Sequence, residues 1–405
     1  MRTTPAASQD EVRRNNLATI LRRLHLEGKT TRSELVAHTG LNRSTVGALV
    51  SELKDEGLVV EEPGSTGSVG RPSLAVAPRP ESAVVLAFDF RVERVVGAVV
   101  GLGGVIIDRV EHTHMRAEVS PAVAVRQLLS MSHELLEAVP EDALWVGTGV
   151  GVPGIIDPRD GLVKQAPNLD WVDVPLGKLL SQALRDEFGE VPFTVVGNDA
   201  DLGALAEHVR GAAAGLRNVI YLSGEVGIGG GVVLNDQLMS GAGGFGGEVG
   251  HMIVDPEGAP CHCGSRGCWE TVIGLDAVVS CLKQATSDTT VADVVAAAQA
   301  GDRDTQRRLD AVGSWLGIGI SNLINIFNPD VIVLGGHLSE ILPEIRKNME
   351  EKVGHAIRAS REQVHIVAPV LGVESTLVGA AESAFTPLLA GPIEALRESS
   401  SFLTS

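Results

Sequence analysis

One histidine and three cysteines lie close together in the chain, with a spacing that suits a metal ion. His251 is followed by Cys261, Cys263 and Cys268, with two glycines between the last two cysteines. A Cys₃His set forms closed tetrahedral zinc sites that are structural, because no position stays open for water. The alternative is a redox pair or inert buried thiols, but this density of cysteines in a cytoplasmic chain favours metal. We therefore predict one structural Zn²⁺ per chain, with Cys281 left as a core residue.

The first 80 residues have a pattern typical of a helix-turn-helix that contacts DNA. Apolar residues at helical spacing run from Glu11 to Leu26, and a second, short helix begins after Thr31 or Ser33. Gly40 permits the tight turn that leads into a third helix. Short polar and bidentate side chains in the exposed first turn of that helix suit base edges and phosphates.

A β-hairpin wing is predicted directly after the third helix. Two apolar stretches, 58–60 and 74–76, flank a loop rich in glycine and serine over 64–70. The loop is followed by Gly70-Arg71-Pro72, a rigid segment that can present Arg71 to a narrow minor groove. The alternative is a small helical interaction domain with a flexible linker. The candidate DNA contacts of this module are Arg32, Asn42, Arg43, Ser44, Thr45 and Arg71.

The charge of the 405-residue chain is unevenly distributed. Its net charge of -18 argues against a protein that coats nucleic acid non-specifically. Residues 1–80 hold 11 Lys/Arg and 9 Asp/Glu, a net of +2, so the remainder carries -20. A module of net charge +2 binds DNA weakly as a single copy. We therefore predict a homodimer or homotetramer on a palindromic operator in double-stranded DNA.

Composition also limits where the protein works. No stretch approaches the roughly 18 uninterrupted apolar residues of a membrane span. The first residues lack the apolar segment of a secretory signal. Four cysteines are too few for a disulfide scaffold. We expect a cytoplasmic protein with no membrane partner.

From about residue 84, apolar strands alternate with helices rich in alanine and leucine, which indicates an α/β body. Two segments, 84–101 and 218–235, both read as strand, polar turn and strand. These related hairpins predict two similar lobes with a cleft between them. We expect a winged helix over 1–80, a first lobe over 81–200, a second lobe with the metal site over 201–390, and a disordered tail over 391–405.

These motifs together resemble the ROK family, named for repressor, open reading frame and kinase. Glu248-Val249-Gly250-His251 followed by Cys-x-Cys-Gly-x-x-Gly-Cys resembles the family's ExGH and zinc motifs, and the resemblance covers nearly the whole chain. The segments 152–154, 167–169 and 197–199 look like its sugar-site segments. The resemblance implies a two-lobed, actin-like (RNase H-like) sugar-kinase fold, and the N-terminal winged helix marks the repressor branch.

By the same resemblance, a sugar or sugar phosphate binds between the lobes. Carboxylates and amides suit this role because they hydrogen-bond hydroxyl groups. His251 would place one ring nitrogen on zinc and the other toward the sugar. The candidate sugar ligands are Gly154, Asn168, Asn198, Asp199, Glu248, His251 and Glu270.

The kinase machinery departs from the family pattern. Asp199 matches the general base, but the first phosphate loop, Asp-x-Gly-Gly-Thr in the family, reads Asp-Phe-Arg-Val-Glu from Asp89. The second loop has Val226 in place of a hydroxyl and adds the negative charge of Glu225, which repels polyphosphate. His337 replaces a third glycine on the adenosine side.

We therefore expect a pseudo-kinase and not an enzyme. The protein is predicted to be a transcriptional regulator, a repressor of carbohydrate or amino-sugar genes, whose body senses a sugar or sugar phosphate. Two alternatives stay open: a bifunctional ATP-dependent sugar kinase that also binds DNA, and a repressor controlled by a protein partner.

Overall fold

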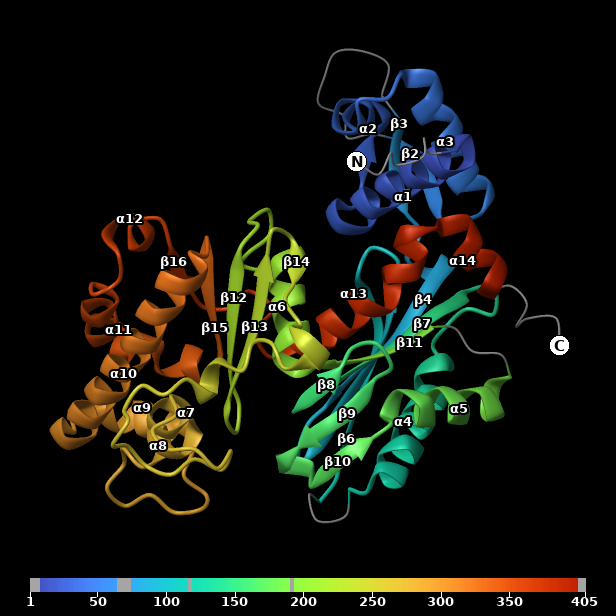
Figure 1. Cartoon of the computed structure of the whole chain (residues 1–405). Coiled ribbons are helices and arrows are strands. Elements are labelled where there is room, and N and C mark those ends of the chain that lie inside the picture. The colour runs from blue at the N-terminus through green and yellow to red at the C-terminus, as the bar shows by residue number, and fades with distance from the viewer. Residues whose placement is uncertain (1–7, 64–73, 116–118, 190–192, 400–405) are drawn as a thin grey trace, which may run out of the picture. The chain divides into compact units, whose positions relative to one another are not determined.

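The structure, a computed structural model, describes residues 8–63, 74–115, 119–189 and 193–399 (Figure 1). The predicted DNA contact Arg71 lies outside these residues. The chain forms two compact units, one of residues 1–197 and 380–405 and the other of residues 198–379. No helix in the described ranges is long and apolar enough to cross a membrane.

The N-terminal part of the first unit is a winged helix, as predicted. Its elements are α1 (Gln9–Glu27), β1 (Thr30–Thr31), α2 (Arg32–Thr39), α3 (Arg43–Asp55), β2 (Val59–Pro63) and β3 (Leu74–Pro78). The strands form an antiparallel sheet in the order β1-β3-β2. Leucines of α1 pack with Leu35 of α2 and with Val46 and Leu53 of α3, all of them at or near 0% exposed. The apolar spacing seen in the sequence therefore forms this small core.

Side-chain caps set the helix boundaries of the winged helix. Thr31 and Glu34 form a reciprocal capping box at the beginning of α2. Gly40 follows α2 in the left-handed conformation, with φ 69°. Asn42 Oδ1 accepts the backbone N–H of Thr45 at 2.9 Å and so caps α3. Each cap of this kind contributes about 1 kcal/mol.

The body of the first unit is built on a five-stranded sheet in the order β11-β7-β4-β5-β6. Its strands are β4 (Ala83–Phe90), β5 (Arg94–Gly101), β6 (Val105–Thr113), β7 (Leu144–Val152) and β11 (Phe193–Asn198). The short helix η1 (Pro80–Ser82) leads into it, and α4 (Pro121–Leu136) and α5 (Leu176–Phe188) belong to the same unit. A small sheet holds β8 (Ile155–Asp157), β9 (Leu162–Ala166) and β10 (Trp171–Val174), with η3 (Pro167–Leu169) before β10.

The second unit repeats this plan with a sheet in the order β14-β13-β12-β15-β16. Its strands are β12 (Val219–Gly224), β13 (Ile228–Leu234), β14 (Gln237–Leu238), β15 (Val331–Gly336) and β16 (His365–Val367). Its helices are α6 (Asp199–Arg210), α7 (Glu270–Ile273), α8 (Leu275–Val279), α9 (Val291–Gln299), α10 (Arg303–Phe327), α11 (His337–Val353) and α12 (Arg358–Arg361), with the short η4 (Ala242–Gly244), η5 (Val249–His251) and η6 (Gly372–Glu374).

The predicted internal similarity is present in the two sheets. Strands β4 and β5 form an antiparallel hairpin, and β7 runs parallel to β4. Strands β12 and β13 form the matching hairpin, and β15 runs parallel to β12. The two hairpins therefore occupy equivalent places in sheets of the same order.

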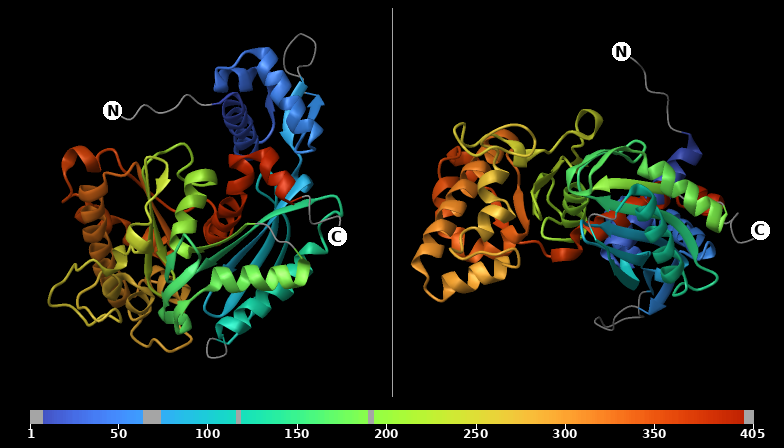
Figure 2. Two further views of the ribbon diagram at one scale, coloured as in Figure 1. Left: turned by 45° about the vertical axis from the view of Figure 1, so that its right-hand side comes forward. Right: turned by 90° about the horizontal axis from the view of Figure 1, so that it is seen from below.

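The C-terminal part of the chain differs from the expected boundaries. Helix α13 (Ser375–Ala390) continues past the second unit, and α14 (Pro392–Ser399) belongs wholly to the first unit (Figure 2). A Cβ at Gly149 of β7 would lie 2.0 Å from the carbonyl oxygen of Ala380, so α13 packs directly on that strand. Ala395 and Leu396 are buried, so the disordered tail predicted from residue 391 is wrong for 392–399. The apolar face of α14 outweighs its polar composition.

Candidate metal centre and ligand site

Three consecutive glycines of β13 position the segments that carry the site in the second unit. A Cβ at Gly231 would lie 2.3 Å from the carbonyl oxygen of Ala200, so the beginning of α6 rests directly on this strand. A Cβ at Gly230, on the other face, would lie 2.4 Å from Val249 Cγ2. The strand therefore admits α6 on one face and the η5 segment on the other, which any larger side chain would prevent.

Two predicted sugar ligands stand at the N-terminus of α6. Asn198 is the N-cap, and its Oδ1 accepts the backbone N–H of Asp201 at 2.9 Å. Its Nδ2 donates to Asp199 Oδ1 at 3.0 Å, and the same oxygen accepts the backbone N–H of Ala200 at 2.9 Å. Both side chains are half-buried and held in one orientation by these bonds. They are therefore preorganised to meet a ligand hydroxyl.

Asp201 is the second acidic residue in this first turn and was not among the residues predicted from the sequence. Its Oδ1 is buried without a hydrogen-bond partner in the described part of the chain. Burial raises the pKa of Asp201 to about 7, and the negative charges of Asp199 and Glu248 contribute to the increase. The signal was present in the sequence, because Asp201 follows the Asn198-Asp199 pair by two residues.

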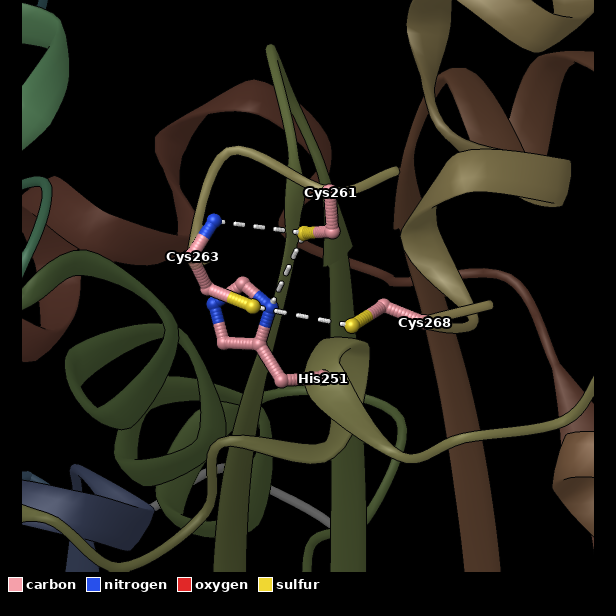
Figure 3. A group of neighbouring side chains, drawn as sticks. All are labelled: His251, Cys261, Cys263 and Cys268. Carbon is pink, nitrogen blue, oxygen red and sulfur yellow. Dashed lines mark hydrogen bonds between the residues drawn. The ribbon is translucent and has the colours of Figure 1, made fainter. Parts of the chain in front are cut away.

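The four predicted metal ligands converge on one point (Figure 3). All their ligand atoms lie within 4.8 Å of one another. Cys261 Sγ is 3.7 Å from His251 Nδ1, and Cys263 Sγ is 3.6 Å from Cys268 Sγ. Zn–S bonds of about 2.3 Å in a tetrahedron place sulfur atoms about 3.8 Å apart, so the donor set fits zinc. The cluster can hold a metal ion.

Burial disfavours the ionised form of two of the three thiols in the cluster. Burial and the contact with Glu270 raise the pKa of Cys261 above its ordinary value. Burial likewise raises the pKa of Cys268. A positive charge at the centre of the cluster would stabilise the thiolates against this effect.

Glu270 joins the metal cluster to the predicted sugar ligands. Its Oε1 lies 3.0 Å from Cys261 Sγ and 3.7 Å from His251 Nδ1. The other ring nitrogen of His251, Nε2, faces Glu248 Oε2 at 4.0 Å. The two ring nitrogens of His251 therefore face different groups, Nδ1 the thiol of Cys261 and Nε2 the carboxylate of Glu248. Burial raises the pKa of Glu248 above its ordinary value.

The buried side chain of Trp269 supports the segment that carries Cys268 and Glu270. It lies between Cys268 and Glu270 in the chain and is 0% exposed. Its indole Nε1 donates to the carbonyl of Trp315 at 2.9 Å, and its backbone N–H donates to the carbonyl of Met252 at 2.8 Å. The adjacent metal and sugar candidates are thus anchored on α10 by a buried aromatic side chain.

The remaining two sugar candidates lie in the first unit. Gly154 follows β7 with φ 120°, and a Cβ there would lie 2.3 Å from the carbonyl oxygen of Gln165. Asn168 is half-buried in η3. The structure therefore places Gly154 and Asn168 in one unit and the other five candidates in the other.

Both segments that would correspond to phosphate loops hold other contacts. Arg91 Nε donates to the buried Asp89 Oδ2 at 2.6 Å. In the second unit His337 is 4% exposed, and its Nε2 donates to the carbonyl of Ile273 at 2.9 Å. A Cβ at Gly224 would lie 2.9 Å from the His337 ring. The imidazole therefore packs against the end of β12.

The predicted DNA contacts in the described part of the winged helix differ in exposure and in pairing. Asn42, Arg43 and Ser44 are exposed at the beginning of α3, and Thr45 is half-buried. The Asn42 side chain also accepts the hydroxyls of Ser44 and Thr45, at 2.6 and 3.1 Å. Arg32 differs from them, because its guanidinium pairs with Glu61 of β2 at 2.7 Å. Arg32 therefore ties α2 to the wing strand.

The fold and the site define a winged helix joined to an actin-like body of the sugar-kinase type. A profile described as the ROK family matches residues 87–386, and the chain belongs to that family. The chain is 32% identical over 381 residues to a xylose repressor of Bacillus spizizenii, covering 92% of this chain and 97% of that protein.

Other family members resemble the chain over different extents. It is 33% identical over 258 residues to a glucokinase of Thermotoga maritima, covering 60% of this chain and 79% of the kinase. A crystal structure of a ROK family transcriptional regulator, a homologue of the E. coli MLC protein, superimposes with a TM-score of 0.77. That match is 23% identical and covers 97% of this chain and 100% of the other, and it supports the fold.

Proposed function

We propose that the protein is a DNA-binding transcriptional repressor of carbohydrate or amino-sugar genes, regulated by a sugar or sugar phosphate. One observation carries the proposal: a winged helix with an exposed polar first turn on α3 shares a chain with a preorganised cluster of hydroxyl-binding side chains. The extent of the two matches supports it. The xylose repressor aligns with 92% of the chain and the glucokinase with only 60%.

The sugar is bound in the second unit by Asn198, Asp199, Glu248 and Glu270, joined by His251. Carboxylate oxygens accept ligand hydroxyl protons, and the Asn198 amide both donates and accepts. The contact between Glu270 and Cys261 supports a link between the metal centre and this site. The ion is structural Zn²⁺, held by His251 and the three cysteines, and it stabilises the segment that carries Glu270.

The DNA interface is formed by Arg43, Ser44 and Thr45 on α3, with Asn42 holding the helix N-terminus toward a phosphate. Arg71 and Arg32 are further contacts in this proposal, and Arg32 also pairs with Glu61 of β2. Two or four chains bind a palindromic operator, because one module of net charge +2 makes too few phosphate contacts.

The body does not transfer phosphate. The ion pair of Asp89 with Arg91 supports this, because a carboxylate already neutralised by a guanidinium has little charge left for a Mg²⁺–phosphate complex. The His337 ring against β12 supports it as well, because it fills space next to the second loop. Asp199 then serves as a hydroxyl acceptor and not as a general base.

The experiment is an operator-binding titration. Genomic fragments selected by the purified protein supply the DNA, and fluorescence anisotropy gives its affinity with and without each member of a sugar and sugar-phosphate panel. A ligand that changes DNA affinity about tenfold, with loss of its effect in Asp199→Asn, is the expected outcome. A DNA affinity that no carbohydrate alters would exclude sugar control and favour control by a protein partner.

A sugar kinase that also binds DNA is the second candidate, and Asp199 is the observation that favours it. ATP consumption with hexoses, pentoses and amino sugars tests it directly. Turnover that is abolished by Asp199→Asn, with sugar binding kept, would establish the kinase and remove the pseudo-kinase assignment.

A further inference from the structure

Helix α13 belongs to both units. Its residues 375–379 lie in the second unit, and the helix continues without interruption into the first unit from Ala380 to Ala390. The two ends of one helix therefore make their contacts in different units. The contacts at each end determine which movements the helix can transmit.

In the second unit, the first turn of α13 holds the helix that carries two sugar ligands. Thr376 Oγ1 donates to the backbone carbonyl of Asp199 at 3.2 Å. Ser375 Oγ donates at 2.9 Å to Oε1 of Glu207, a residue of α6 that is 0% exposed. A Cβ at Gly379 would lie 1.9 Å from the carbonyl oxygen of Leu202, so the two helices touch backbone to backbone. A shift at the beginning of α6 must therefore move α13 or break these contacts.

Glu207 strengthens this attachment. Its carboxylate also accepts the backbone N–H of Leu371 at 3.0 Å and that of Ala212 at 2.7 Å. A buried carboxylate with several donors is strongly held, because losing any donor leaves part of its charge unsolvated. Helix α6 and the segment that enters α13 thus form one body within the second unit.

In the first unit, the next turns of α13 hold the first helix of the winged helix. His25 of α1 is 0% exposed, and its Nε2 lies 3.2 Å from both carboxylate oxygens of Glu382. Its Nδ1 accepts the backbone N–H of Gly103 at 2.9 Å, which places the ring proton on Nε2. The ring also packs on Phe385 at a centroid distance of 4.8 Å.

The distance between these two attachments is short. Thr376 and Glu382 are six residues apart, which is about 9 Å along an α-helix with no loop between them. Arg22 of α1 adds a contact to the carbonyl of Leu389, near the end of the same helix. Helix α13 therefore contacts the winged helix and also donates a hydrogen bond to the backbone carbonyl of Asp199.

We propose that α13 is the coupling element between the effector and DNA, with Thr376 its attachment to the sugar site and Glu382 the positioning residue for the winged helix. This inference rests on the proposed function, because it describes how that sugar site acts on that DNA-binding module. A ligand that hydrogen-bonds to Asp199 shifts α6, and the first turn of α13 moves with it. The contact between His25 and Glu382 then changes, and the position of α3 changes with it.

The test separates coupling from binding. Thr376→Val removes the hydrogen bond to the carbonyl of Asp199, and Glu382→Gln weakens the contact with His25 by removing the negative charge, each with little change in volume. Glu187→Gln is the matched control, because Glu187 pairs with His133 on the surface of the same unit, away from α13. Each variant is first checked for folding by circular dichroism. Sugar affinity is measured by calorimetry without DNA, and DNA affinity with and without the sugar that regulates the unmodified protein.

We expect both variants to keep sugar and DNA affinities within about threefold while the sugar-induced change in DNA affinity falls about tenfold. The control keeps the full change. Unaltered coupling in both variants would overturn the role of α13 and leave the proposed function intact. An unmodified protein whose DNA affinity no sugar alters would overturn both. If Glu382→Gln does not fold, Thr376→Val decides the outcome alone.

Discussion

The guanidinium of Arg91 and the carboxylate of Asp89 form an ion pair of 2.6 Å at the turn after the first strand of the body. Asp89 is 2% exposed, so the pair places a positive charge beside a buried carboxylate. At this turn a sugar kinase of the family needs backbone N–H groups facing phosphate. Here the Arg91 N–H donates to the carbonyl of Arg94, which closes a hairpin instead.

Arg91→Ala should therefore destabilise the protein without creating a phosphate site. Removing one partner of a buried pair costs on the order of 2–4 kcal/mol in the free energy of unfolding. Urea unfolding measures the loss, and calorimetry with Mg²⁺–ATP should detect no binding in either form. Arg94→Ala is the control, because Arg94 pairs with the more exposed Glu111 and should change stability by less than about 1 kcal/mol. ATP binding by the unmodified protein would contradict this account of the turn.

Metal removal should destabilise the second unit. Elemental analysis is expected to find about one zinc per chain. A chelator should lower the melting temperature, and Cys268→Ala should lower it similarly and abolish the chelator's effect, because the same site is lost in both cases. Cys281→Ala, which changes a buried cysteine outside the cluster, should keep both the zinc and the chelator response. Zinc retained in full by Cys268→Ala would contradict the ligand set.

Because of Asp201, the free energy of unfolding should decrease as the pH rises. The carboxyl ionises near pH 3.8 when unfolded and near pH 7 when folded, because burial opposes its charge. Between these values the folded protein binds the extra proton, so stability falls from about pH 4 to pH 7 and then levels off.

Asp201→Asn removes this dependence. The difference in the free energy of unfolding between the variant and the unmodified protein should increase in the variant's favour by up to about 3 kcal/mol from pH 5 to pH 8. Urea unfolding at the two pH values measures this difference. Asp288→Asn, at an exposed position of the same unit, should show no such gain. A gain of equal size in both variants would remove the assignment to Asp201.

Arg43→Ala should weaken operator binding more than Arg32→Ala does at the same folded stability. Arg43 is exposed at the beginning of α3, whereas Arg32 is already paired with Glu61. We expect a loss of about 1–3 kcal/mol and a smaller salt dependence for Arg43→Ala. Arg346→Ala, on α11 of the second unit, serves as the control. Unchanged DNA affinity of Arg43→Ala would exclude this face of α3 from the interface.

Features that depend on near neighbours in the chain could be predicted from the sequence. The caps at Thr31 and Asn42 each use a residue three positions away, so the helices of the winged helix were predictable. The four metal ligands lie within 18 residues, and their spacing by itself predicted the cluster. The two related hairpins predicted two similar sheets, because strand and turn patterns are local signals.

Contacts between distant residues were decided by the tertiary structure alone. His25 and Glu382 are separated by 357 positions, and neither has a local pattern that indicates the other. The pairing of Arg32 with Glu61 joins α2 to β2 over 29 positions, and no local pattern indicates it. Burial raises the pKa of Asp201, and the packing of α13 on β7 returns the C-terminus to the first unit. Such effects depend on which surfaces exclude water together, and only the folded chain determines that.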